Sequence, residues 1–228
     1  MKKQEFKIDG KVINTEIKEI KELFKKADTF EDGKNRFLSF HSNLYKSEMS
    51  GVKGPTIEDQ LWENLSETVA RKSVISKGRT VLYGLWHSTR IEDMTMNVLV
   101  KRDNQIYRSG NFKEKIKAGI DHTGNSLSRD GILELSCSIN IDALNTYRIE
   151  VGRRSRQIIR SLNFSDLKRK VLPEDIDRIR LEDGVDDVPS ANWLLDFWGN
   201  KTVEGILMMP AARHQIVHLN ESFKAKKN

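Results

Sequence analysis

The sequence predicts an all-helical protein whose four long helices form an antiparallel or crossover four-helix bundle. Only four prolines and fourteen glycines interrupt its 228 residues. Between them, several stretches place apolar side chains three and four positions apart, which is the spacing of an amphipathic helix. Apolar residues make up 37% of the chain and charged residues 32%, a balance typical of helix-rich globular proteins and not of disordered chains.

The first predicted long helix covers residues 32–49. One face of it carries apolar side chains and one histidine, namely Phe37, Phe40, His41, Leu44 and Tyr45. Upstream, residues 5–26 are amphipathic but rich in lysine, so we expect this segment to pack on the outside of the bundle. Downstream, a shorter helix is predicted over residues 56–72, because Thr56 and Asp59 have the spacing of a capping box.

The other three long helices are predicted over residues 79–102, from residue 128 or 130 to 162, and over residues 201–223. The first of these has one face formed by Gly84, His87, Ile91, Met94 and Val98. The last contains Pro210, which lacks a backbone N–H and clashes with the preceding turn. We therefore expect either a kink at this point or the start of a new helix, and the kink is the favoured interpretation.

Two less regular stretches separate the long helices. We interpret residues 101–125 as an insertion between the second and third helices, and residues 163–200 as an insertion between the third and fourth. Short helices are predicted in the second insertion, over residues 174–181 and 191–198. No repeat, low-complexity tract or linker indicates a second domain.

The domain organisation follows from these elements and from the distribution of charge. We expect a bundle domain over residues 31–223, an extension over residues 1–30 that packs on it, and a basic tail over residues 224–228. The chain has 39 Lys and Arg residues against 33 Asp and Glu residues, a net charge of +6. Most of the excess lies at the two ends, whereas a protein that reads nucleic acid gathers cations on a face of its folded body. Nucleic acid is therefore not an expected partner.

Several features that the sequence lacks also limit the possible functions. No apolar run approaches the roughly 18 residues that a membrane-spanning helix needs, so no membrane association is expected. No apolar segment of a secretory signal follows the amino terminus. Cys137 is the only cysteine, so no internal disulfide can form. We accordingly expect a cytoplasmic protein with a small-molecule substrate and, if it associates with another chain, a homodimer.

The histidines are the strongest chemical signal in the sequence. His214 and His218 stand four residues apart, so on a helix both rings share one face and can reach one metal ion. His87 lies on the apolar face of the second predicted helix, where an unsatisfied ring is unfavourable. One divalent ion would satisfy all three rings together. Two partly exposed histidines on a helix surface, together with a satisfied core histidine at position 87, explain the same spacing, and the pattern alone leaves both interpretations open.

Two segments resemble motifs of the DinB-like superfamily, also described as YfiT-like metalloenzymes. Residues 86–97 (WHSTRIEDMTMN) resemble the motif on the second helix of that family, and residues 210–221 (PAARHQIVHLNE) are similar to the motif on its last helix. In the family, one histidine on the second helix and an H-x-x-x-H pair on the fourth hold a divalent metal, commonly nickel or zinc, inside a four-helix bundle. The resemblance extends over about residues 33–222 and implies that His87, His214 and His218 are the metal ligands.

The resemblance also implies a class of reaction. Characterised relatives include thiol-dependent S-transferases and a thiol-dependent isomerase, so the implied function is metal-dependent S-transfer with a low-molecular-weight thiol as cosubstrate. Three imidazoles leave positions open for water as well as for a thiol. A metal-assisted hydrolase and a non-catalytic metal- or ligand-binding bundle are therefore the alternatives. The two insertions and the first 30 residues have no counterpart in compact members, so the substrate class is not implied.

Three further residues are candidates for positions around the metal. Glu221 follows His218 by three residues and can accept a hydrogen bond from its ring, although a surface role is an alternative. His41 either faces the same cavity or is a core histidine hydrogen-bonded to a neighbour. Asn97 is the weakest candidate of the three. No residue is predicted to be the catalytic acid or base.

Overall fold

The structure is a computed structural model that describes residues 10–72 and 74–227. Within these residues the regular structure is helical, apart from one isolated antiparallel bridge between Lys170 and Thr202. The prediction of an all-helical protein is therefore confirmed. None of the described helices is both long enough and apolar enough to cross a membrane.

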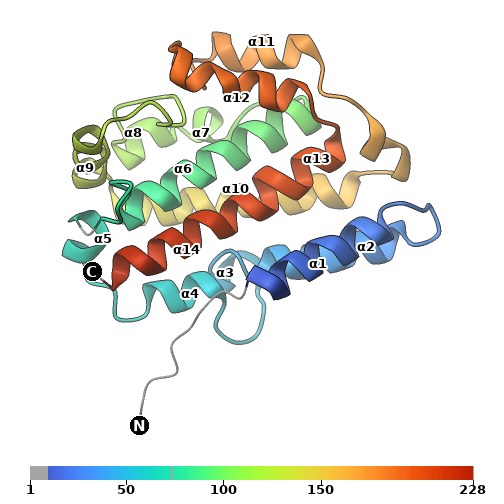
Figure 1. Cartoon of the computed structure of the whole chain (residues 1–228), viewed down its shortest axis with the longest axis horizontal. Helices are drawn as coiled ribbons and strands as arrows, with labels where there is room; N and C mark the ends of the chain where they lie inside the picture. Colours follow the sequence, from blue (N-terminus) through green and yellow to red (C-terminus); the bar gives the residue numbers. More distant parts are fainter. Residues whose placement is uncertain (1–9, 73, 228) are drawn as a thin grey trace.

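The elements are labelled along the chain in Figure 1. In order they are α1 (Gly10–Leu23), α2 (Phe30–Ser42), α3 (Ser47–Ser50), α4 (Ile57–Trp62), α5 (Glu67–Lys72), α6 (Val81–Met94), the π-helical η1 (Thr95–Lys101), α7 (Ile106–Ser109), α8 (Phe112–Ile116), α9 (Arg129–Ser138), α10 (Ile141–Ser161), the 3-10 helix η2 (Phe164–Lys168), α11 (Pro173–Leu181), α12 (Pro189–Gly199), α13 (Val203–Met208), the π-helical η3 (Met209–His214) and α14 (Gln215–Lys226).

Side-chain caps determine where several of these helices begin. The Oγ1 of Thr56 accepts the backbone N–H of Asp59, and Oδ2 of Asp59 accepts the backbone N–H of Thr56. This pair is the capping box predicted from the sequence. Other helices also begin after a residue whose side-chain oxygen accepts the N–H three positions further on. These residues include Ser66 before α5, Thr80 before α6, Ser128 before α9, Asn140 before α10 and Thr202 before α13.

Three segments predicted as single helices are divided in the structure. Residues 32–49 form α2 and α3, residues 56–72 form α4 and α5, and residues 128–162 form α9 and α10. The prediction of one helix in each segment is wrong, because the helical spacing of apolar side chains can continue across a turn at which the backbone is not helical. Asn140 caps α10 and thereby separates it from α9. Asn64, between α4 and α5, has a φ of 55°, which is outside the right-handed helical range.

The last long helix is modified at Pro210, not ended there. α13, η3 and α14 follow one another without an intervening turn, and the π-helical segment begins at the residue before Pro210. The wider π-turn accommodates a residue that has no N–H to donate to the preceding turn. The expected disruption at Pro210 thus takes the form of a π-helical segment that ends at His214.

Within the described residues, the centre of the molecule consists of α6 with η1, α10, and α13 with η3 and α14 (Figure 1). α6 packs against both α10 and α14, and α2 packs against α10. α1 lies along α2 and buries Ile17 and Ile20, and Phe24 directly after α1 is buried as well. Residues 1–9 of the expected extension lie outside the described residues. Residues 224–226 of the expected tail continue α14.

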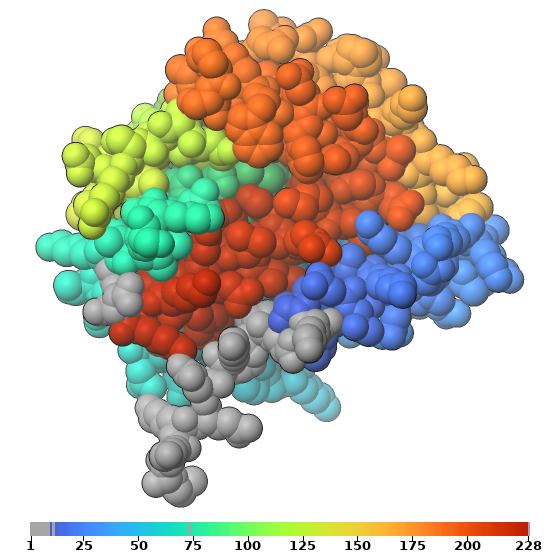
Figure 2. All heavy atoms as spheres, viewed as in Figure 1, coloured from blue at the N-terminus to red at the C-terminus, as the bar shows by residue number. Residues whose placement is uncertain are grey.

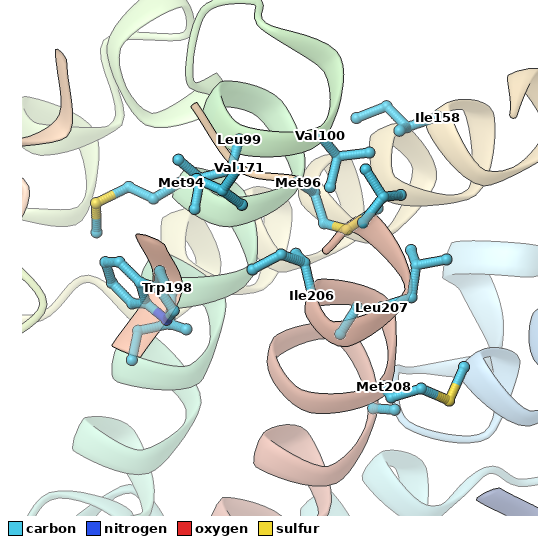
Figure 3. Packing of buried hydrophobic residues seen from close by; sticks show 14 of the residues in the cluster. Met94, Met96, Leu99, Val100, Ile158, Val171, Trp198, Ile206, Leu207 and Met208 are labelled. Carbon is cyan, nitrogen blue, oxygen red and sulfur yellow. The ribbon is translucent and has the colours of Figure 1, made fainter. Parts of the chain in front are cut away.

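The hydrophobic core consists of two clusters that adjoin where the candidate histidines lie. Figure 3 shows the first cluster, in which Trp198 from α12 and Ile206 from α13 pack against η1. The second cluster packs the beginning of α6 against α9, α10 and α14. Along α6 the boundary between the clusters falls between Trp86 and Ile91, and along the last helix it falls within residues 212–216. Polar side chains at this boundary are therefore enclosed by apolar packing on both sides.

Candidate metal centre

The structure brings His87, His214 and His218 together from distant parts of the chain. The ring centroid of His87 lies 5.1 Å from that of His214 and 4.7 Å from that of His218. The centroids of His214 and His218 are 4.5 Å apart. One ring nitrogen from each residue lies within 4.8 Å of the other two. Three imidazoles in this arrangement can hold one metal ion.

Gly84 explains how α6 and α14 approach closely enough for this convergence. It lies almost one turn before His87 on α6. A Cβ atom at this position would lie 3.0 Å from Oγ of Ser222 and 3.6 Å from the carbonyl oxygen of His218. A larger side chain would therefore push α14, and with it His218, away from α6.

Partners on the outer ring nitrogens orient two of the three imidazoles. Nδ1 of His87 lies 2.6 Å from the carbonyl oxygen of Thr123. Because a carbonyl oxygen only accepts, this Nδ1 carries the proton and Nε2 carries the lone pair. Nδ1 of His218 lies 3.1 Å from Oε2 of Glu221. That contact is not aligned as a hydrogen bond, but the adjacent negative charge favours the proton on Nδ1, so Nε2 is again the nitrogen left for a metal.

His214 completes the set of three rings. Its Nε2 lies 3.1 Å from Nε2 of His218, whereas its Nδ1 is buried without a hydrogen-bond partner among the described residues. Two nitrogens bound to one ion at about 2.0–2.1 Å in tetrahedral geometry are about 3.3 Å apart, so the observed distance fits a shared ion. The same distance also fits a hydrogen bond between two neutral rings.

Burial keeps all three rings in the neutral form that binds metal. It lowers the pKa of His87 well below its usual value, and the neighbouring His218 lowers it further. It also lowers the pKa of His214 well below its usual value, again with a contribution from His218. Burial lowers the pKa of His218 as well, although Glu221 opposes this effect. Since neutral imidazoles are the ligands of a divalent ion, the cluster needs little proton release to accept one near neutral pH.

Glu221 and Arg79 form an ion pair beside the histidines. Nη1 of Arg79 lies 3.0 and 2.9 Å from the two carboxylate oxygens of Glu221. Burial raises the pKa of Glu221, but the contacts with His218 and Arg79 outweigh it and bring the pKa to about 2. The sequence indicated Glu221 as a neighbour of His218. It did not indicate Arg79, which directly precedes the residue that caps α6.

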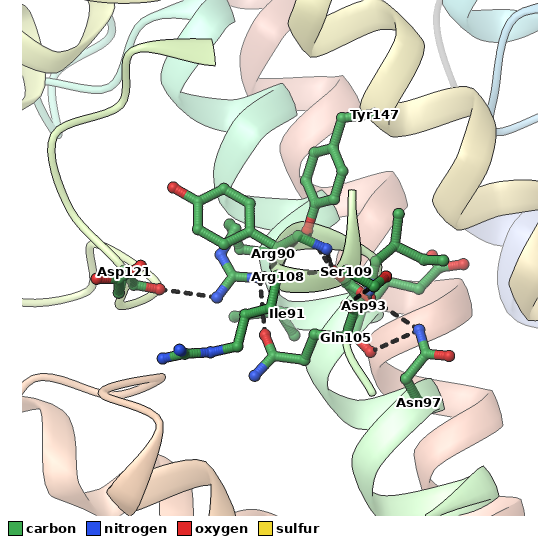
Figure 4. A network of polar contacts seen from close by, with 12 residues as sticks. Arg90, Ile91, Asp93, Asn97, Gln105, Arg108, Ser109, Asp121 and Tyr147 are labelled. Carbon is green, nitrogen blue, oxygen red and sulfur yellow. Dashed lines mark hydrogen bonds and ion pairs between the residues drawn. The ribbon is translucent and has the colours of Figure 1, made fainter. Parts of the chain in front are cut away.

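A loop of the first insertion supplies the carbonyl that orients His87. Nη2 of the buried Arg90 on α6 donates to the carbonyl oxygen of Asp121 at 2.7 Å (Figure 4). The N–H of Thr123 donates to the carbonyl oxygen of Gly184, in the second insertion, at 3.0 Å. The loop is thus held by Arg90 of α6 and by the backbone of Gly184. This double attachment fixes the position of the Thr123 carbonyl.

His41 does not join the three histidines. Its Nε2 lies 2.9 Å from Oε1 of Glu92, and both side chains are fully buried. The same carboxylate accepts hydrogen bonds from Tyr45 at 2.7 Å and from Gln215 at 2.8 Å. His41 is therefore a core histidine hydrogen-bonded to a neighbour through Nε2, the second of the two interpretations that the sequence allowed, and its Nδ1 is buried without a partner among the described residues. It does not line the pocket described below.

Asn97 also lies away from the histidines, in a second buried polar network (Figure 4). Its Nδ2 donates to Oδ1 of Asp93 at 2.7 Å, and its Oδ1 accepts from Nε of Arg154 at 3.1 Å. The Asp93 carboxylate also accepts from the hydroxyl of Tyr147 at 2.7 Å. Burial raises the pKa of Asp93, and the charge of Arg90 and the hydrogen bond from Tyr147 oppose the rise. The network joins α6 and η1 to α10, so the position of Asn97 gives it a structural role and not a place beside the three histidines.

A pocket of about 280 Å³ lies beside the three histidines. Both insertions contribute to its wall, Asn125 from the first and four apolar side chains of α12 from the second. The α12 residues are Trp193, Leu194, Phe197 and Trp198. Trp193 is 52% exposed and Trp198 only 1%, so the first forms the rim and the second the inner wall. A largely apolar pocket with a few polar groups is typical of a small-molecule site.

Two of these pocket residues were not found by sequence reasoning. Oδ1 of Asn125 is buried without a hydrogen-bond partner among the described residues, which leaves an acceptor free in the pocket wall. Trp193 is the other, and its signal was the run WLLDFW, in which helical spacing leaves one tryptophan off the buried face. The sequence does not show that Asn125 and Trp193 lie beside the histidines, because that depends on contacts between distant elements.

Comparisons with known proteins do not add a family. No family model matches the chain, and no curated protein is significantly similar to it.

Proposed function

We propose that this protein is a metal-dependent enzyme of the DinB-like type, in which His87, His214 and His218 bind one divalent ion, nickel or zinc. One observation carries the proposal: three neutral imidazoles from two packed helices converge beside a pocket of small-molecule size. In this assignment α2, α6, α10 and α14 are the four helices of the bundle, with the two insertions between them. The packing of α6 against α10 and α14 supports it.

The chain's own residues have distinct parts in such a site. A divalent ion bound by three imidazoles keeps open positions and lowers the pKa of a thiol or of water there. Thr123 and Glu221 hold the outer ring protons in place, which keeps the Nε2 lone pairs on the inner side. Trp193 and Phe197 exclude water from the pocket, and the free amide oxygen of Asn125 accepts a hydrogen bond from a polar group of the substrate.

The reaction that we propose is S-transfer from a low-molecular-weight thiol to an electrophilic small molecule. The thiol sulfur forms a bond to an electrophilic carbon, and the leaving group departs with the electron pair of the bond that breaks. The proton of the thiol passes to solvent or to the leaving group. The resemblance of residues 86–97 and 210–221 to the DinB-like motifs favours this reaction over metal-assisted hydrolysis.

Metal analysis of protein purified without an affinity tag tests the site. We expect one equivalent of a tightly bound divalent metal, and its loss in both His87→Ala and His214→Ala. His122→Asn is the matched control, because His122 lies outside the cluster and asparagine keeps a side-chain acceptor for the N–H of Gly124, now 3.1 Å from the ring. Tight binding of one equivalent by both alanine variants would show that the three histidines are not the ligands.

The reaction is tested separately, on the metal-loaded protein. Consumption of a low-molecular-weight thiol in the presence of an alkylating electrophile is compared with hydrolysis of ester and amide substrates. We expect thiol consumption that disappears when a chelator removes the metal and returns when the metal is restored. Thiol consumption that is insensitive to the chelator, or metal-dependent hydrolysis without any thiol requirement, would exclude S-transfer.

A further inference from the structure

A second hollow adjoins the pocket beside the histidines. It has a volume of about 300 Å³ and is lined by residues of α1, α12, α13 and η3. Phe197 and Met209 line both hollows, so only shared side chains separate them. Figure 2 shows α1, in blue, lying directly against the carboxyl-terminal helices on this face of the molecule. The amino-terminal helix therefore contributes to the surroundings of the candidate metal centre.

The charged residues that line the second hollow are all cationic. They are Lys21 from α1, Lys201 just before α13 and Arg213 from η3, and no acidic side chain of the described residues is among the lining. Within the described structure none of these three side chains makes an ion pair or a hydrogen bond with a protein group. Nζ of Lys201 instead lies 4.0 Å from the centre of the Phe197 ring. Three unpaired cations around one hollow create a local positive potential that attracts an anion.

The pocket beside the histidines offers no comparable cation of its own. Arg79 lines it, but both oxygens of Glu221 lie within 3.0 Å of the Arg79 guanidinium. The remaining wall is largely apolar, with Trp193 and Phe197 on one side. The two hollows thus differ in character: one suits an apolar group, and the other suits a negative charge.

We propose that the two hollows together bind an amphipathic small-molecule anion. Its aromatic or acyl body lies beside the histidines, against Trp193 and Phe197, and its carboxylate, sulfonate or phosphate group lies among Lys21, Lys201 and Arg213. The inference rests on the proposed function, because it takes the pocket beside the histidines as the substrate site. It assigns part of the substrate site to α1, a helix that lies outside the region of the DinB-like resemblance.

Two fluorescent probes that share one aromatic body test this assignment. One is 8-anilinonaphthalene-1-sulfonate, an anion, and the other is N-phenyl-1-naphthylamine, its neutral counterpart without the sulfonate. Both are titrated against the full-length, metal-loaded protein. We expect the double variant Lys21→Ala/Arg213→Ala to bind the anionic probe about tenfold more weakly, because two charge contacts are lost. Its affinity for the neutral probe should stay within about twofold, because the apolar contacts remain.

Two further variants locate the binding site. Trp193→Ala should weaken both probes, and because Trp193 is half-exposed this change leaves the core intact. Lys53→Ala/Lys72→Ala removes two exposed lysines that line neither hollow, and it should leave both affinities unchanged. The proposal would be overturned if the Lys21/Arg213 variant bound the anionic probe as tightly as the unaltered protein, or if it lost affinity equally for both probes. It would also be overturned if the control variant weakened the anionic probe as much as the Lys21/Arg213 variant does.

The measurement also separates this proposal from the proposed function. Metal content is measured in every variant, and probe binding is repeated on protein from which the metal has been removed. If the protein retains no metal but binds the anionic probe in a way that depends on Lys21 and Arg213, the metal centre is overturned and the anion subsite is supported. A chain that holds metal but shows no charge-dependent binding would overturn the anion subsite alone.

Discussion

The charges around the three histidines nearly cancel in the metal-free protein. The rings are neutral because burial lowers their pKa values. The pKa of Glu221 is about 2, so its carboxylate is ionised at neutral pH and is balanced by the guanidinium of Arg79. The exposed ammonium of Lys77 lies 3.7 Å from the same carboxylate and adds a positive charge at the surface. A divalent ion in this cluster would therefore leave a net charge of at least +2. Such a charge favours an anionic ligand in the open position, which agrees with both a thiol cosubstrate and an anionic substrate.

The substitution Glu221→Gln tests the role of the Glu221 carboxylate. The substitution keeps the size of the side chain but removes the charge that holds the proton on Nδ1 of His218. We expect metal affinity to fall about 10- to 100-fold, as for other changes to the partners of metal-binding histidines. Competition with a chromophoric chelator measures it. Glu174→Gln serves as the control, because this exposed residue pairs with Arg102 away from the site. An equal loss in both variants would contradict the assignment.

The lowered histidine pKa values predict how the stability of the metal-free protein depends on pH. Unfolding restores an ordinary pKa near 6.5 to each ring, so below that pH the unfolded chain binds more protons than the folded one. Stability should therefore fall as pH decreases from about 7.5 to 5.5. Urea unfolding at both pH values measures the change, and it should be smaller in His214→Gln, which lacks one of the titrating rings. An equal pH dependence in the two proteins would show that His214 is not held neutral by burial.

At the scale of elements, α6 is the helix on which the site depends. All of its residues are buried, although the sequence predicted an amphipathic helix with one main apolar face. Its charged side chains are satisfied internally: Glu92 by His41, Tyr45 and Gln215, and Asp93 by Tyr147. Because these partners come from α2, α10 and α14, the polar contacts fix the rotation of α6 about its own axis. That rotation directs His87 toward α14.

Gly84→Leu tests the close packing of α6 on α14. The larger side chain meets Ser222 and the backbone of His218, so the two helices must separate. Overpacking of this kind costs about 1–3 kcal/mol of unfolding free energy, and we expect metal affinity to fall at least tenfold as His218 moves away. Gly84→Ala should have a smaller effect on both quantities, because the Ser222 hydroxyl can rotate. Retention of full metal affinity by Gly84→Leu would show that the helix spacing does not control the cluster.

At the scale of the whole molecule, two segments that connect long helices convert a cluster of helix side chains into an enclosed site. The loop at residues 121–125 supplies the Thr123 carbonyl and the free amide oxygen of Asn125, and α12 supplies the aromatic wall. The last helix contacts both hydrophobic clusters and carries two of the three histidines. A ligand held by the cluster therefore links elements from the beginning of α6 to the end of the chain.

Metal binding should consequently stabilise the entire fold. A ligand present at about 100 times its dissociation constant adds about 2.7 kcal/mol to the unfolding free energy. In a protein of this length each kcal/mol raises Tm by about 2–4 °C, so we expect a rise of about 5–11 °C on adding nickel or zinc to chelator-treated protein. Differential scanning calorimetry measures it. The same addition should leave His87→Ala unchanged, and an equal rise in that variant would indicate binding elsewhere.

The sequence by itself determined the features that depend on neighbours along the chain. Helical periodicity predicted the all-helical class, the spacing of Thr56 and Asp59 predicted a capping box, and the interval between His214 and His218 placed two rings on one face. These follow from backbone geometry within one or two turns. The resemblance of residues 86–97 and 210–221 to known motifs implied that His87 joins that pair. Only the tertiary structure decided that the three rings meet, that His41 and Asn97 belong to other networks, and that Arg79, Asn125 and Trp193 surround the histidines. These positions depend on the packing of elements distant in sequence, and no local spacing encodes the distance between two helices.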